Sequence, residues 1–118
     1  MTDSPTRAFA VDRADATSFE PLMIDGVQIG EARWLRTEGS DGNVHEACLW
    51  RTDAPARYDY LFTGDESFQV LEGSVSIELT DTGESVKLKA GDIASFKKGT
   101  RSVWSFDEPF KKFTVISA

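Results

Sequence analysis

The sequence of 118 residues contains a single cysteine, Cys48, and a single histidine, His45. A single thiol excludes an internal disulfide, and a single imidazole excludes a histidine-rich metal site or a conventional catalytic triad. No apolar run approaches the roughly 20 residues of a membrane-spanning helix. The first residues also lack a basic leader with a hydrophobic stretch behind it, so we expect a cytoplasmic protein with no membrane partner.

Positive charge is scarce as well. Thirteen basic residues stand against twenty acidic ones, which gives a formal net charge of −7 at pH 7. Such a surface repels a phosphate backbone, so we predict no nucleic-acid partner. The composition of 40% hydrophobic and 28% charged residues is typical of a soluble globular protein, and the length fits one domain.

No stretch of the sequence shows helical spacing of apolar residues, and short segments separated by turn residues follow one another instead. Branched and aromatic residues are concentrated in these segments and predict nine strands: 27–35, 44–51, 57–62, 66–71, 74–79, 85–88, 93–96, 101–106 and 110–116. Residues 1–22 show neither pattern and are predicted to form an N-terminal arm, with residues 23–118 as the domain. Short strands without covering helices protect their edges by closing into a barrel or stacking two sheets, so we predict an all-β fold.

Two stretches of this pattern resemble the motifs of the cupin superfamily. The run Gly64–Gly73 contains Glu66 and Gly73, which match the Glu and the Gly of the first cupin motif. The run Gly91–Gly99 resembles the second motif, except that Lys97 stands where proline is usual.

Two tryptophans indicate which branch of the superfamily the sequence resembles. Trp50 precedes a Thr-x-x-Pro turn and Trp104 follows the second motif, as in the cupin branch typified by ureidoglycine aminohydrolase-type and ethanolamine-utilisation-type domains. The resemblance covers about residues 26–117 and implies a single-domain cupin, a double-stranded β-helix or jelly-roll barrel. It also implies a homodimer. It does not fix the function, because cupins include enzymes, sugar-binding domains and storage proteins.

The resemblance also shows where metal ligands would stand. In metal-binding cupins two histidines lie three or four residues before the motif Glu and a third lies in the second motif. The first two positions are Tyr60 and Phe62 here, or Asp59 and Leu61 with the longer spacing, and the third is Ser102. Glu66 is therefore the one remaining ligand of the usual four. Zinc, iron, nickel and copper prefer imidazole or thiolate donors, so we predict no metal and no other cofactor.

Strand alternation predicts which side chains share a chamber. Successive side chains of a strand point to opposite faces, so placing the motif positions inward brings a common set together. The expected lining is Trp50, Tyr60, Phe62, Glu66, Ser102 and Trp104, while Trp34 is expected to lie outside it. A mostly apolar lining with a few polar groups is usual for a small-molecule site. The alternative is that these aromatic residues only fill the core of a small barrel.

Glu66 is the residue expected to carry chemistry. A carboxylate inside an aromatic barrel costs free energy unless it is paired, hydrogen-bonded or protonated, and the expected lining contains no lysine or arginine. We therefore predict a raised pKa for Glu66. Beside the Tyr60 hydroxyl it would act as a general acid or base or anchor a ligand, so Glu66 and Tyr60 are the candidate catalytic residues. The candidate ligand-binding residues are Trp50, Phe62, Ser102 and Trp104.

The remaining reactive side chains are left outside this site. We interpret His45 as a surface or hydrogen-bonded strand residue, and Cys48 as a thiol packed like a small hydrophobe. The first functional hypothesis is then a metal-independent cupin that binds a small polar metabolite, with acid/base chemistry of isomerase, lyase or hydrolase type at Glu66. The alternatives are a metal-dependent enzyme resembling ureidoglycine aminohydrolase and a non-catalytic sensor or assembly domain.

Overall fold

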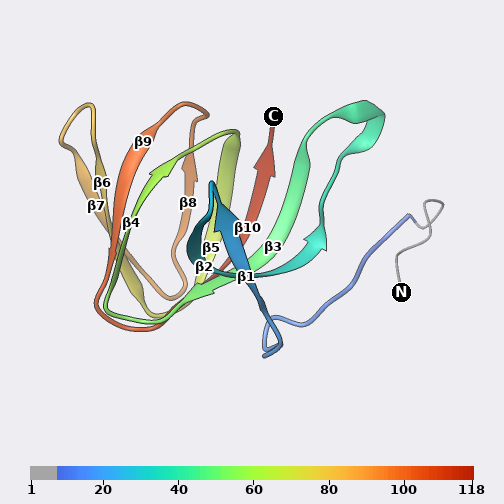
Figure 1. Ribbon diagram of the computed structural model, residues 1–118, viewed down its shortest axis with the longest axis horizontal. Coiled ribbons are helices and arrows are strands. Elements are labelled where there is room, and N and C mark those ends of the chain that lie inside the picture. The colour runs from blue at the N-terminus through green and yellow to red at the C-terminus, as the bar shows by residue number, and fades with distance from the viewer. Residues whose placement is uncertain (1–7) are drawn as a thin grey trace.

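Strands make up most of the computed structural model, which describes residues 8–118 (Figure 1). Among these residues the strands are β1 (Glu20–Ile24), β2 (Val27–Arg36), β3 (His45–Thr52), β4 (Ala56–Leu61), β5 (Asp65–Glu72), β6 (Ser74–Leu79), β7 (Ser85–Lys89), β8 (Ile93–Phe96), β9 (Arg101–Phe106) and β10 (Phe110–Ser117). One short 3-10 helix, Ser40–Gly42, lies between β2 and β3. The all-β prediction is confirmed, and each of the nine predicted strands is found within one residue at both ends.

The strand β1 was not predicted. It pairs antiparallel with β2 and crosses the expected boundary between arm and domain at residue 22. The described part of the arm contacts the sheet, because Arg33 of β2 forms an ion pair with Asp12 at 2.6 Å and Lys111 of β10 donates to the carbonyl oxygen of Ala14. Residues 1–7 of the expected arm lie outside the described residues.

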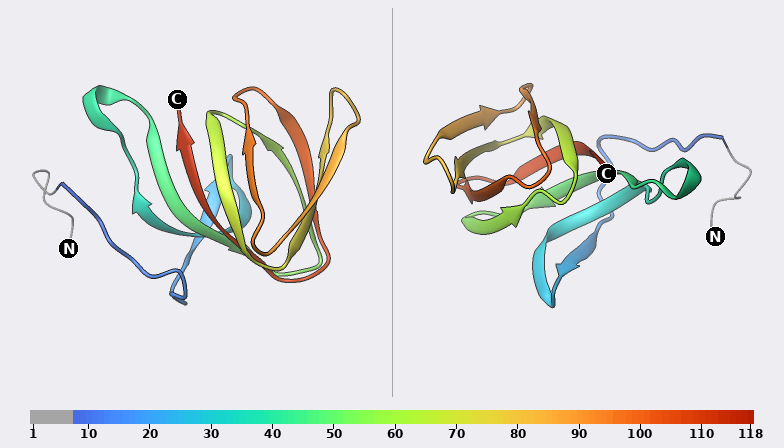
Figure 2. Two further views of the ribbon diagram at one scale, coloured as in Figure 1. Left: turned by 180° about the vertical axis from the view of Figure 1, so that it is seen from behind. Right: turned by 90° about the horizontal axis from the view of Figure 1, so that it is seen from above.

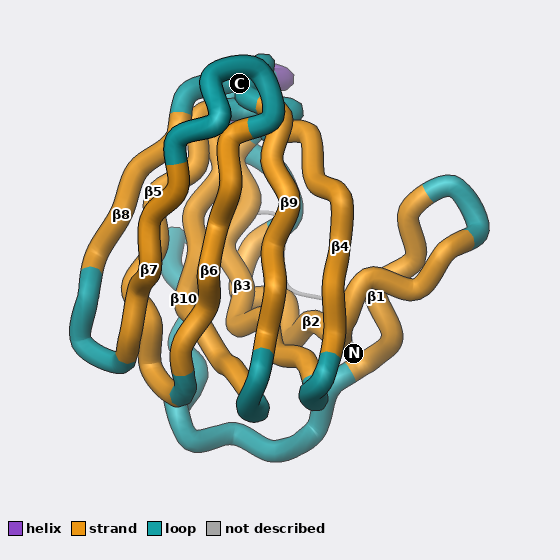
Figure 3. Tube along the Cα trace, turned by 90° about the vertical axis from the view of Figure 1, so that its left-hand side faces the viewer, coloured by secondary structure: helices purple, strands orange, loops and turns teal. Residues whose placement is uncertain are grey.

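The strands form two antiparallel sheets that face each other (Figures 1 and 3). The larger sheet has the order β1-β2-β3-β10-β5-β8, and the smaller has the order β4-β9-β6-β7. Figure 2 shows from above that the β1–β2 hairpin projects beyond the body formed by the other strands. In the described residues no helix is long and apolar enough to cross a membrane.

Aromatic side chains fill the space between the sheets. Phe62, Phe106 and Phe110 are each at most 2% exposed, and Phe62 stacks on Phe96 with ring centroids 4.8 Å apart. Trp104 of the smaller sheet meets Trp50 of the larger one edge to face at 6.4 Å. The core is thus built from the inward faces of both sheets, as the alternation predicts.

Candidate functional site

The strand β10 lies at the centre of the larger sheet and sets which residues meet on its inner face. Its register places Lys112 opposite Val70 of β5 and Ile116 opposite Glu66, with Thr114 between them on the same face. The Lys112 side chain is long enough for its Nζ to reach Glu66 Oε2 at 2.8 Å, past the one intervening position on this face. The inner face of β10 therefore presents an ammonium group and a hydroxyl to Glu66.

Glu66 is the acceptor of three hydrogen bonds. Lys112 Nζ donates to Oε2 at 2.8 Å, Thr114 Oγ1 donates to Oε2 at 2.6 Å, and Tyr60 Oη donates to Oε1 at 2.7 Å. The carboxylate is 1% exposed and Lys112 is 5% exposed. Glu66 lies beside the Tyr60 hydroxyl as expected, but the expectation that it has no basic partner is wrong.

This ion pair reverses the expected titration of Glu66. Burial by itself raises the pKa of the carboxyl group, but the charge of Lys112 and the three hydrogen bonds outweigh it and hold the pKa below its ordinary value. The prediction of a raised pKa is therefore wrong, because it left out Lys112. Burial, and then the charge of Glu66, raise the pKa of Tyr60, so its hydroxyl stays protonated and remains the donor.

Lys112 is the functional candidate that the sequence reading missed. Its Nζ lies over three aromatic rings, 4.5 Å from the centroid of Trp104, 4.6 Å from Phe68 and 5.4 Å from Trp50. Such faces attract an ammonium group through the ring quadrupole. The sequence could have indicated that Lys112 points inward, because it alternates along the strand with Phe110 and Thr114. The alternation was ambiguous, because the other face, with Phe113 and Val115, looks equally apolar.

A hollow of about 70 Å³ lies beside this ion pair. Four of the predicted residues line it, namely Trp50, Tyr60, Glu66 and Trp104. The other lining residues are Leu22, Ile24, Ile29, Trp34, Cys48, Tyr58, Lys112, Thr114 and Ile116. The lining is therefore apolar except for the network around Glu66.

Phe62 and Ser102 do not line the hollow. Phe62 is 1% exposed and belongs to the aromatic core. The Ser102 hydroxyl is committed to internal bonds, since it donates to the backbone oxygen of Tyr60 at 2.8 Å and accepts from Trp104 Nε1 at 2.9 Å. These two residues hold Tyr60 and Trp104 in place.

Trp34 lines the hollow, contrary to the expectation that it lies outside. It belongs to β2, which places it opposite Cys48 of β3. The β1–β2 hairpin forms one wall, and this wall was missed because β1 was not predicted. Gly30 of β2 permits the close approach, since it has a φ of +61° and a side chain there would lie 2.6 Å from the Trp50 ring.

Cys48 also borders the hollow, and its thiol is neutral. Burial raises the pKa of the thiol to about 12, although the nearby charge of Lys112 lowers it. A protonated thiol is a poor nucleophile and a poor metal ligand. The structure therefore supports the interpretation of Cys48 as a packing residue.

The donors at this site do not fit a transition metal. Phe62 offers no ligand atom, the Ser102 hydroxyl is committed to internal bonds, and the Lys112 ammonium already provides the cation beside Glu66. Among residues 8–118 no group of three or more His, Cys, Asp or Glu side chains is arranged to hold a metal ion.

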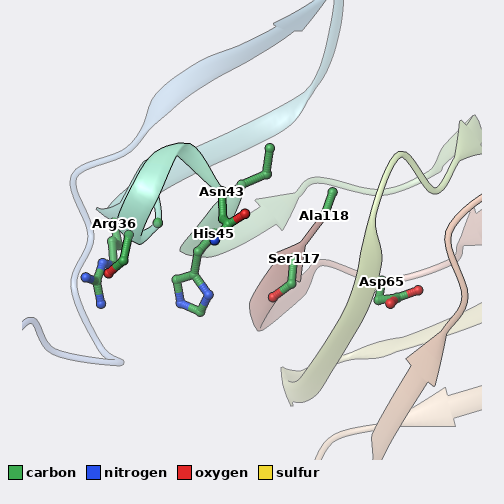
Figure 4. Close-up of a pocket in the computed structure, with 9 residues that line it drawn as sticks. Arg36, Asn43, His45, Asp65, Ser117 and Ala118 are labelled. Carbon is green, nitrogen blue, oxygen red and sulfur yellow. The ribbon is translucent and has the colours of Figure 1, made fainter.

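A larger hollow of about 510 Å³ lies where the C-terminal end of β10 meets the loop after β2, and His45 lines it (Figure 4). His45 and Asp65 flank Ser117 across neighbouring strands. Asp65 accepts a hydrogen bond from the backbone nitrogen of Lys98 at 2.9 Å, so its carboxylate caps a loop. The titratable groups here do not converge on one another as those around Glu66 do. We therefore take the smaller hollow as the candidate site.

Comparison with known proteins agrees with this architecture. The family described as the EutQ-like cupin domain matches residues 39–113. No curated protein sequence matches the chain.

Solved structures resemble the fold at low sequence identity. The EutQ protein of Clostridium difficile has a TM-score of 0.67 at 16% identity, over 83% of this chain and 75% of that one. An ethanolamine utilization protein Q of Salmonella typhimurium has a TM-score of 0.64 at 23% identity, over 85% and 94%. The polyketide cyclase RemF of Streptomyces resistomycificus has a TM-score of 0.71 at 18% identity, over 91% and 77%. These likenesses show the fold.

Proposed function

Since the chain belongs to the EutQ-like cupin domain family, we propose that its barrel binds a small metabolite in the hollow beside the Glu66–Lys112 ion pair. The observation that carries this proposal is the charged, hydrogen-bonded network at the floor of an otherwise apolar hollow. Sites for small molecules combine apolar walls with a few convergent polar groups in this way.

Glu66 and Lys112 act in this proposal as fixed recognition groups. Both oxygens of Glu66 accept hydrogen bonds and its pKa is lowered, so the carboxyl group is not a proton donor near neutral pH. General acid catalysis by Glu66 is therefore not proposed. Tyr60 keeps its place in the site because its hydroxyl donates to Glu66 and its oxygen can accept a hydrogen bond from a ligand.

Two other functions have less support. A metal-dependent reaction of the ureidoglycine aminohydrolase type needs ligands at Tyr60, Phe62 and Ser102, which those side chains do not supply. An assembly or sensor domain without a ligand would have a filled interior, whereas this interior keeps a hollow.

The test is a thermal-shift screen of a metabolite library against the protein and two variants. Ile116→Trp places a larger side chain in the hollow, while Val115→Trp places the same side chain on the opposite face of β10. A ligand at 100 times its Kd adds about 2.7 kcal/mol to the free energy of unfolding.

We expect hits that stabilise the wild type and Val115→Trp but not Ile116→Trp. The proposal fails if no compound stabilises the wild type, or if the hits stabilise Ile116→Trp equally.

A further inference from the structure

The hollow differs in polarity between its floor and its mouth. The floor holds Glu66 and Lys112, which are nearly inaccessible to solvent. The mouth is formed by the β1–β2 hairpin, where Ile24 is 41% exposed and Trp34 is 39% exposed. A ligand that reaches the floor therefore places the rest of its surface against apolar side chains.

The charges at the floor cancel. Glu66 and Lys112 are the only Asp, Glu, Lys, Arg or His residues that line the hollow within the described chain, and they neutralise each other at 2.8 Å. An added anion would lie close to Glu66, and an added cation would lie close to Lys112. In either case one buried charge would remain without a partner, which costs free energy.

Glu46 adds to the penalty for an anion. It lies on β3, opposite Ile116 of β10 and on the same face as Cys48. Its negative charge contributes to the raised pKa of Cys48 and of Tyr60, so its field reaches the lining of the hollow.

The floor still has hydrogen-bonding capacity for a neutral group. Lys112 carries three N–H bonds, and one of them is directed to Glu66. Tyr60 and Thr114 donate their only hydroxyl protons to Glu66, which leaves their oxygens as acceptors. A carbonyl oxygen would accept from Lys112, and a hydroxyl or amide group would also donate to Tyr60 or Thr114.

We infer that the hollow takes an uncharged molecule with an apolar body and a single carbonyl, amide or hydroxyl head group, which points at Lys112 and Tyr60. The inference rests on the proposed function, in which the hollow binds a small molecule. It adds the class of that molecule.

Three probes of nearly equal shape separate the charge classes. Benzamide is neutral, benzoate is an anion and benzamidine is a cation at neutral pH. All three tryptophans of the chain line the hollow, so the indole N–H signals in ¹H–¹⁵N spectra of the full chain report on its occupancy. We expect a Kd for benzamide at least about tenfold below that of either charged probe.

Variants at the floor change its charge in a known direction. Glu66→Gln leaves Lys112 uncompensated and should favour benzoate, while Lys112→Met leaves Glu66 uncompensated and should favour benzamidine. The double variant restores neutrality and should again prefer benzamide. Lys111→Gln changes the net charge as Lys112→Met does, but Lys111 pairs with Glu72 on the other face, so the wild-type order should persist.

The order of the three Kd values is compared within each variant, so a loss of stability does not imitate the result. A charged probe that binds the wild type as tightly as benzamide overturns the inference and leaves the proposed function intact. Absence of indole shifts with all three probes also overturns it, and the proposed function is then judged by the Ile116→Trp comparison alone.

Discussion

Lys111 and Lys112 follow each other in β10, and their side chains are similarly buried, at 12% and 7% exposed, but the carboxylates they pair with differ in exposure. Lys111 pairs at 2.7 Å with Glu72, which is 65% exposed, while Lys112 pairs at 2.8 Å with Glu66, which is 1% exposed. An exposed ion pair contributes about 0–1 kcal/mol to stability. Removing one partner of a buried pair costs about 3–5 kcal/mol, because the other charge remains buried and alone.

We therefore expect Glu66→Gln to destabilise the fold by about 3 kcal/mol at neutral pH. The matched change Glu72→Gln should cost less than about 1 kcal/mol. Urea unfolding of both variants, read as the shift of the midpoint at an unchanged slope, measures the difference. A Glu66→Gln protein that is as stable as the wild type would show that the ion pair contributes nothing to the fold.

The pH dependence of this effect has a fixed sign. The folded-state pKa of Glu66 is lowered, so its contribution to stability is present above the unfolded value of about 4.3 and is lost as the pH falls through the folded value. The stability gap between the wild type and Glu66→Gln should be full at pH 7 and should narrow below about pH 4.3. A gap that widens on acidification would contradict the lowered pKa.

Among the elements, the turn between β5 and β6 constrains the chain most tightly. Gly73 has a φ of +79°, and a Cβ atom there would collide with the carbonyl oxygen of Pro109. Gly83, between β6 and β7, has a similar φ of +75° but open space around the position of its Cβ. The motif glycine of the first cupin stretch is thus required for both backbone conformation and packing.

The two glycines form a matched pair of substitutions. Gly83→Ala should cost about 1 kcal/mol, which is the cost of a left-handed conformation for a residue with a side chain. Gly73→Ala should cost at least about 2 kcal/mol more, because the clash with Pro109 forces the backbone to move. Thermal unfolding of both variants gives the comparison. Equal losses would show that the contact with Pro109 relaxes freely.

At the scale of the whole molecule, two facing sheets bury a charged pair between them. Lys112 reaches Glu66 from the neighbouring strand of the larger sheet, whereas Tyr60 reaches it from the smaller sheet across the interior. The network therefore joins the two sheets as well as forming the floor of the hollow. The homodimer implied by the resemblance stays a prediction, which sedimentation measures directly.

The purified protein should carry no stoichiometric transition metal, because Lys112 supplies the positive charge beside Glu66 and the expected ligand positions offer no imidazole or thiolate. Elemental analysis of protein prepared without a histidine tag tests this. About one manganese, iron, nickel or zinc per chain, lost on Glu66→Ala, would contradict it.

The fold could be predicted because its signals are local. Alternation and turn residues lie within a few positions of each other, which is why nine strands were placed within one residue. The strand β1 escaped because it is five residues long, begins Glu-Pro and keeps most of its side chains exposed. Edge strands of this kind lack the alternation of burial that identifies a strand.

The sequence by itself determined the strands, the motif glycines and which side chains share a face, because successive side chains of a strand alternate. The resemblance to the cupin motifs then predicted that the face with Glu66, Tyr60, Trp50 and Trp104 is the inner one. Only the tertiary structure decided the charge of the site. Lys112 and Glu66 are 46 residues apart, and the β5–β10 register brings them together. The pKa of a buried carboxyl group depends on such partners, so the chemistry of the site followed from the pairing of strands and not from their pattern.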